Sequence, residues 1–159
     1  MNTSHRITAL ILAVGMGLMA WSLAQAQEAG HILLKSADIK WTKAPPSMPP
    51  GTQIAVLEGD LNKAEPFTMR LKLPADSKIG AHTHSTVEHV TVLSGSLYMG
   101  AGDQLDPDQA VALTPGSFAV FQPGHSMFAW ADEETVIQVH GVGPWGIHYL
   151  HSPDNSSKQ

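Results

Sequence analysis

From residue 51 onward, short apolar runs alternate with turn-forming residues. The runs read TQIAVLEG, PFTMRLKLP, EHVTVLSGSLYMG, QAVALTPG, SFAVFQPG, MFAWA, ETVIQVHGVG and GIHYL. Many positions within them alternate between apolar and polar, which is typical of strands that bury one face. Glycine, proline and aspartate between the runs favour turns. No helical period persists for three turns, so the pattern predicts an all-β sandwich or barrel of about eight strands.

The first 26 residues have a different pattern. A charged start is followed by the apolar run ITALILAVGMGLMAWSL and by small residues at Ala24 and Ala26. This order is typical of a signal peptide, so we expect cleavage after Ala26 and a periplasmic or secreted protein. The length of the run leaves an uncleaved anchor as the alternative. No later segment is apolar enough to span a membrane, so no stable insertion is expected after cleavage.

Residues 27–50 are interpreted as an extended, proline-rich arm. Their last part, WTKAPPSMPPG, contains four prolines. Each proline fixes φ and removes a backbone donor, which disfavours a helix or a central strand. We assign the barrel to residues 51–150, and we expect a disordered polar tail over residues 151–159.

Composition narrows the chemistry. The chain has no cysteine, so any metal would be held by His, Asp, Glu or Met. Its formal net charge is -5, and removal of Arg6 with the signal peptide leaves eight basic against fourteen acidic residues, or -6. No basic run is present to follow a phosphate backbone, which argues against a nucleic-acid partner.

The stretch GAHTHSTVEHV, residues 80–90, concentrates four titratable side chains. On a strand, His82, His84 and Glu88 share one face and His89 points to the other. Two imidazoles and a carboxylate on one face are a ligand set for a divalent transition metal such as Fe, Mn, Co, Ni, Cu or Zn. The alternative is a polar outer face with histidines at the strand entrance.

The longer string HTHSTVEHVTVLSG resembles the first motif of the cupin family: HxH, three residues, Glu, six residues, Gly. The family's usual glycine six residues before the first histidine is Asp76 here, a departure at a turn. The similarity extends from Trp41 to Tyr149. It implies a jelly-roll barrel, or double-stranded β-helix, with a metal in its mouth.

The second cupin motif usually ends in a histidine that is the fourth metal ligand. The corresponding stretch here is GSFAVFQPGHSM, in which Met127 occupies that histidine's position and His125 lies two residues early. We take His125 as the fourth ligand and Met127 as the alternative; a third interpretation is that neither binds. A thioether ligand would favour copper, whereas His125 would leave the metal open.

Further residues are candidates for the wall of the cavity. Gln138 and His140 share a face of one predicted strand, and four aromatic residues would add an apolar surface. These four are Phe118, Phe121, Phe128 and Trp130. The segment GVGPWG is read as a turn, because Pro144 and the short remaining chain exclude a dinucleotide-binding helix.

These features leave two classes of function open. One is a metal-dependent enzyme that oxidises or isomerises a small molecule. The other is a non-catalytic periplasmic protein that binds a ligand or a metal, or a metal-free dimeric scaffold. The cupin resemblance also implies a homodimer, and the fold alone does not specify a reaction.

Overall fold

The computed structural model describes residues 30–151, so the predicted signal peptide and residues 152–159 of the predicted tail lie outside the described residues. Contacts divide the chain into two units, Met1–Leu34 and Lys35–Gln159, and every strand within residues 30–151 belongs to the second. Within the described range, no helix has the length and apolar character needed to cross a membrane.

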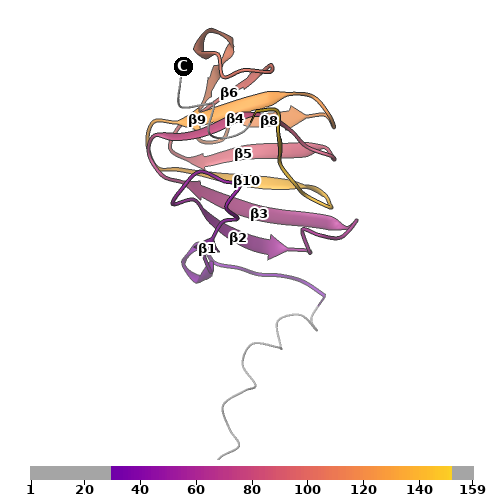
Figure 1. Ribbon diagram of the computed structural model, residues 1–159. Coiled ribbons are helices and arrows are strands. Elements are labelled where there is room, and N and C mark those ends of the chain that lie inside the picture. The colour runs from indigo at the N-terminus through magenta and orange to yellow at the C-terminus, as the bar shows by residue number, and fades with distance from the viewer. Residues whose placement is uncertain (1–29, 152–159) are drawn as a thin grey trace, which may run out of the picture. The chain divides into compact units, whose positions relative to one another are not determined.

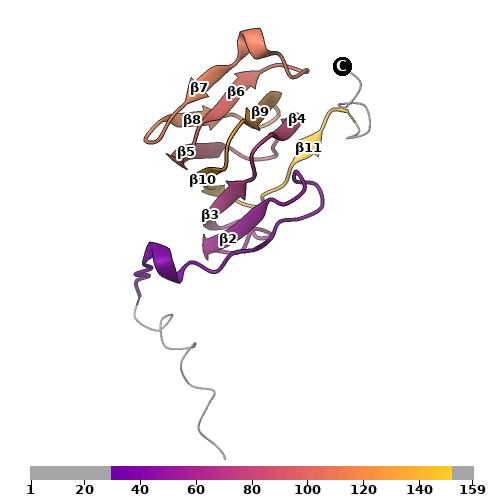
Figure 2. The same cartoon turned by 90° about the vertical axis from the view of Figure 1, so that its left-hand side faces the viewer.

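The second unit is built from two antiparallel sheets, which lie as two layers in Figures 1 and 2. The six-stranded sheet has, in spatial order, β1 (Thr42–Lys43), β2 (Gln53–Glu58), β3 (Pro66–Leu73), β10 (Thr135–Val142), β5 (Glu88–Ser94) and β8 (Phe118–Phe121). The five-stranded sheet has β11 (His148–Tyr149), β4 (Ser77–Thr83), β9 (Met127–Ala131), β6 (Leu97–Ala101) and β7 (Val111–Leu113). Two short 3₁₀ turns are η1 (Ser36–Asp38) and η2 (Pro107–Gln109). The predicted all-β jelly-roll is confirmed.

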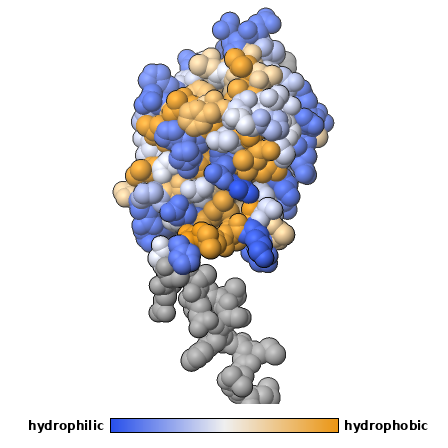
Figure 3. All heavy atoms as spheres, turned by 180° about the vertical axis from the view of Figure 1, so that it is seen from behind, coloured by the Kyte–Doolittle hydropathy of each residue, from blue (hydrophilic) through white to orange (hydrophobic). Residues whose placement is uncertain are grey.

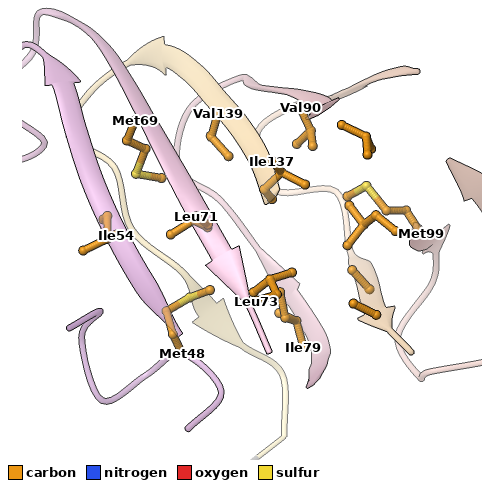
Figure 4. Packing of buried hydrophobic residues seen from close by; sticks show 14 of the residues in the cluster. Met48, Ile54, Met69, Leu71, Leu73, Ile79, Val90, Met99, Ile137 and Val139 are labelled. Atoms are coloured by element: carbon orange, nitrogen blue, oxygen red, sulfur yellow. The ribbon is translucent and has the colours of Figure 1, made fainter. Parts of the chain in front are cut away.

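The core lies between the two sheets. Along β3 the inward positions alternate with half-exposed ones, so that Met69, Leu71 and Leu73 point inward while the residues between them point out. Ile137 and Val139 of β10 follow the same alternation. Figure 4 shows these side chains facing the same interior. The period of two in the sequence thus reports one buried face per strand.

The structure contains strand boundaries that the apolar runs do not mark. Asp76, between two of the runs, makes a turn with a φ of 61°, and β4 begins at the next residue. The run EHVTVLSGSLYMG is divided at Gly95, whose φ is 73°. A Cβ at this glycine would lie 2.5 Å from the carbonyl oxygen of Glu134, so only glycine fits this turn between β5 and β6.

The proline-rich segment packs onto the barrel through its last residues. Ala44 and Met48 are buried in the core, and the Tyr149 hydroxyl donates a hydrogen bond of 2.8 Å to the Ser47 carbonyl. Over residues 30–50, only the two residues of β1 pair as a strand, and they lie at the edge of the sheet. Seen from behind, the surface of the described part is a mosaic of polar and apolar patches (Figure 3).

Candidate metal centre

The three side chains predicted as ligands are brought together from two sheets. His82 lies on β4 of the five-stranded sheet, His84 follows the end of that strand, and Glu88 begins β5 of the six-stranded sheet. All three are buried, with 3%, 5% and 6% of their surface exposed. They share one cavity, whereas His89 lies on the other face of β5, half-buried. The predicted separation of His89 from the other three is therefore present.

A β-bulge, which the simple alternation did not predict, turns the two histidines inward. Ser77 and Ile79 face inward opposite Ala131 and Ala129, but the next aligned pair is His82 opposite Met127. Three residue steps on β4 thus match two on β9. One extra residue shifts the inward parity from odd to even numbers.

Both imidazoles are oriented by backbone carbonyls. The Nδ1 atom of His82 lies 2.7 Å from the Gly80 carbonyl oxygen, within the bulge, and Nδ1 of His84 lies 2.7 Å from that of Gly146. A carbonyl only accepts, so we assign the proton to Nδ1 in each ring. In the neutral rings, Nε2 then carries the lone pair that a metal needs. The two rings are edge to face, with centroids 4.9 Å apart.

Glu88 is held between a donor and one of these imidazoles. The Trp145 indole Nε1 donates to Glu88 Oε2 over 2.8 Å, and the same oxygen lies 3.4 Å from His84 Nε2. Burial raises the pKa of Glu88 above its ordinary 4.5, opposed by the nearby His84 and by the indole donor. Although it is this close, His84 Nε2 makes no hydrogen bond within the described part of the chain. The carboxylate oxygen and this ring nitrogen therefore lie close together without being joined by a hydrogen bond.

His82 is held neutral by its surroundings. Burial lowers the pKa of His82 to about 4, and the proximity of His84 lowers it further, while the hydrogen bond to Gly80 acts in the opposite direction. A neutral imidazole is the form that binds metals. At neutral pH, no proton has to leave His82 before a metal binds.

A cavity of about 30 Å³ adjoins this cluster, between the two sheets. This volume holds about one or two water molecules. Its wall is apolar apart from His82, His84 and Glu88, and is completed by Met48, Leu71, Ile79, Val90, Leu97, Met99, Met127, Ala129, Ile137, Trp145 and Ile147. The cavity therefore has room for an ion with little water, and an organic substrate would require the wall to open.

His125, expected as the fourth ligand, does not lie beside the other three in this structure. His125 is exposed in the turn before β9, where its Nδ1 lies 3.3 Å from the Pro123 carbonyl. Met127, the alternative, is 2% exposed and lines the cavity. The strand begins at Met127, so its side chain enters the barrel while a residue two positions earlier is still in the loop.

The six residues predicted to line the cavity do not do so. On β10 the apolar Ile137 and Val139 take the inward face, which leaves Gln138 and His140 on the outer one. The Gln138 Oε1 atom accepts a hydrogen bond from Arg70, and His140 stacks on His89 with centroids 4.6 Å apart. The prediction chose the wrong parity for this strand.

The four aromatic residues do not line the cavity either. On β9, Met127 faces inward, so Phe128 and Trp130 face outward. Phe128 is nevertheless buried, because it packs over Gly100. Phe118 is 56% exposed, and Phe121 packs beside the core without reaching the cavity.

Sequence reasoning missed the contributions of Trp145, Gly146 and Met48. The segment GVGPWG was read as a turn, yet its tryptophan binds Glu88 and its last glycine orients His84. The Trp145 backbone N–H donates to the Leu61 carbonyl over 2.7 Å, which fixes the segment. A tryptophan among glycines and prolines was the available signal, because a buried indole N–H needs an acceptor.

The donors fit a metal, but they are not drawn together around one. Over residues 30–151, no three His, Asp or Glu side chains already have the arrangement of a metal site. The fit rests on the chemistry of the donors: two neutral imidazoles oriented through Nδ1, a neighbouring carboxylate and an unpartnered, buried His84 Nε2.

The two-sheet jelly-roll, with two histidines and a glutamate on an interior cavity, has the cupin fold. The chain belongs to the DUF4437 family, described as a domain of unknown function, whose family model matches residues 25–146. A comparison with curated protein sequences finds no match.

Solved structures with the same fold include an RmlC-like cupin from Shewanella frigidimarina NCIMB 400, at 12% identity over 70% of this chain and 89% of that one, with a TM-score of 0.56. KdgF from a Halomonas species matches at 16% identity over 72% and 94%, with a TM-score of 0.55. The polyketide cyclase RemF from Streptomyces resistomycificus matches at 14% identity over 79% and 89%, with a TM-score of 0.63. At these identities the likeness concerns the fold.

Proposed function

We propose that this chain is an exported cupin that binds one transition-metal ion through His82, His84 and Glu88. The observation that carries the proposal is the orientation of both imidazoles by backbone carbonyls beside a buried carboxylate. Such backbone contacts fix the ring tautomer and direction in metal sites. The ion would supply a Lewis-acidic centre with open positions for a small molecule.

The proposed site has two possible uses, catalysis and non-catalytic binding. One use is catalysis: the enzyme would oxidise or isomerise a small, largely apolar molecule. RemF, which has the same fold, is named as a polyketide cyclase, so the fold is compatible with catalysis. The competing function is non-catalytic binding of a metal or ligand. Its support is the cavity of about 30 Å³, which has no room for an organic substrate unless the wall opens. A homodimer stays a prediction.

Elemental analysis of the purified full chain after reconstitution at neutral pH tests the metal site. We expect close to one ion per chain and loss of it in a His82→Asn/His84→Asn variant. The matched control is His89→Asn/His140→Asn, which removes two neighbouring histidines outside the cavity. Less than about 0.2 ion per wild-type chain, or equal loss in both variants, would reject the site.

Two further measurements address catalysis and export. Oxygen uptake with a panel of phenols and diketones separates an oxygenase from a binding protein. N-terminal sequencing of protein from a periplasmic fraction should begin at Gln27 if cleavage follows Ala26. A chain that retains its first residues in the membrane fraction would contradict the export proposal.

A further inference from the structure

The inward side chain at the position opposite His82 is a thioether. Met127 pairs with His82 across β4 and β9, and both side chains enter the same cavity. Directly opposed residues of an antiparallel pair have Cβ atoms about 5 Å apart. The flexible methionine side chain can therefore direct its sulfur toward an ion held by His82.

The wall of this cavity is rich in soft donors. Two more thioethers, of Met48 and Met99, line the same wall. Thioether sulfur is a soft ligand, and soft ligands favour Cu(I) over harder ions such as Mn(II).

We propose that Met127 is a metal ligand beside His82 and His84, and that this thioether makes the centre selective for Cu(I). This inference rests on the proposed metal site and adds to it the identity of the ion and the fourth side chain. Glu88, held by its hydrogen bond from Trp145, stays the third ligand of the proposed site. His125 has no part in the centre.

The test measures Cu(I) affinity of the full chain by competition with bicinchoninate under anaerobic, reducing conditions. Met127→Leu preserves an apolar side chain of similar size and removes the sulfur. Because loss of a supporting group alone weakens metal binding by about 10-fold to 100-fold, we expect at least about a tenfold weaker affinity. Met69→Leu, at a buried methionine outside the cavity, and His125→Ala are the controls, and both should retain wild-type affinity.

Two measurements keep the inference testable if Met127→Leu folds poorly. X-ray absorption of the Cu(I)-loaded wild type should show a copper–sulfur shell. Met127→His should shift the preference from Cu(I) toward Co(II) and Zn(II). Absence of the sulfur shell, or a folded Met127→Leu variant within about twofold of wild-type affinity, overturns the inference.

The two proposals fail in different ways. If the wild type binds Co(II) or Zn(II) through His82 and His84 while its affinity for Cu(I) does not depend on Met127, the metal site is supported and the proposed selectivity for Cu(I) is refuted. If His82→Asn/His84→Asn leaves the binding of every ion unchanged, both proposals are refuted.

Discussion

The hydrogen bond from Trp145 to Glu88 gives a test of the site that is independent of metal. Trp145→Phe keeps an aromatic ring beside His84, whose ring centroid lies 6.1 Å from that of the indole, and removes the donor that binds Glu88 over 2.8 Å. A hydrogen bond to a charged group contributes about 1.5–3 kcal/mol, and one between neutral groups about 1 kcal/mol. The cost of the substitution should therefore depend on whether Glu88 is ionised.

The sign follows from the pKa of Glu88, which burial raises above 4.5. A raised carboxyl pKa contributes stability at low pH that is lost as pH rises through the folded-state value. The indole donor lowers this pKa and so limits that loss. In the metal-free protein, Trp145→Phe should thus cost about 1 kcal/mol near pH 4 and about 1.5–3 kcal/mol well above the titration of Glu88.

Urea unfolding at both pH values, with m-values compared, measures this difference. Trp130→Phe is the matched control, because Trp130 stacks on Tyr98 on the outer face, with centroids 4.9 Å apart, and does not line the cavity. Its cost should not depend on the ionisation of Glu88. A cost of Trp145→Phe that is the same at both pH values would show that only packing was lost and would refute this account of Glu88.

Three further predictions concern stability. The pKa of His82 is lowered from 6.5 to about 4, so the stability that its neutral form provides is complete above pH 6.5 and falls as the pH drops toward 4. The loss amounts to about 3 kcal/mol of unfolding free energy. Denaturation of the metal-free wild type over this pH range should show the loss, and the His82→Asn variant should not. Gly100→Ala places a Cβ against the Phe128 ring and 2.8 Å from the Gln109 carbonyl oxygen, so it should lower the free energy of unfolding by about 1–3 kcal/mol. The control Gly80→Ala, whose new Cβ has its nearest contact at 4.0 Å, should leave the free energy of unfolding unchanged. Equal denaturation midpoints for the two variants would contradict this prediction. With metal present at 100 times its dissociation constant, binding should raise the unfolding free energy by about 2.7 kcal/mol, and a chelator should remove this gain. A melting curve that the chelator leaves unchanged would contradict the metal site.

The sequence predicted which three side chains converge, although its reason was incomplete. Even numbering was taken to place His82, His84 and Glu88 on one strand, but the chain turns between His84 and Glu88, and a bulge corrects the parity. Spacing along the chain indicates a motif without showing such a bulge. The cavity wall was harder to predict, because the choice between Gln138 and Ile137 as inward residues depends on which face the opposite sheet covers.

The polar cluster is difficult to explain as a device for stability. His82, His84 and Glu88 lie in an otherwise apolar wall, and His84 Nε2 is without a hydrogen bond among the described residues, which costs about 1–3 kcal/mol. Replacing buried ionisable groups by apolar ones of similar volume is often neutral or stabilising. Yet the backbone carbonyls of Gly80 and Gly146 and the indole of Trp145 hold this cluster in a fixed orientation. A bound cation would give the unpartnered nitrogen a ligand role and give those three contacts a purpose, which packing alone does not.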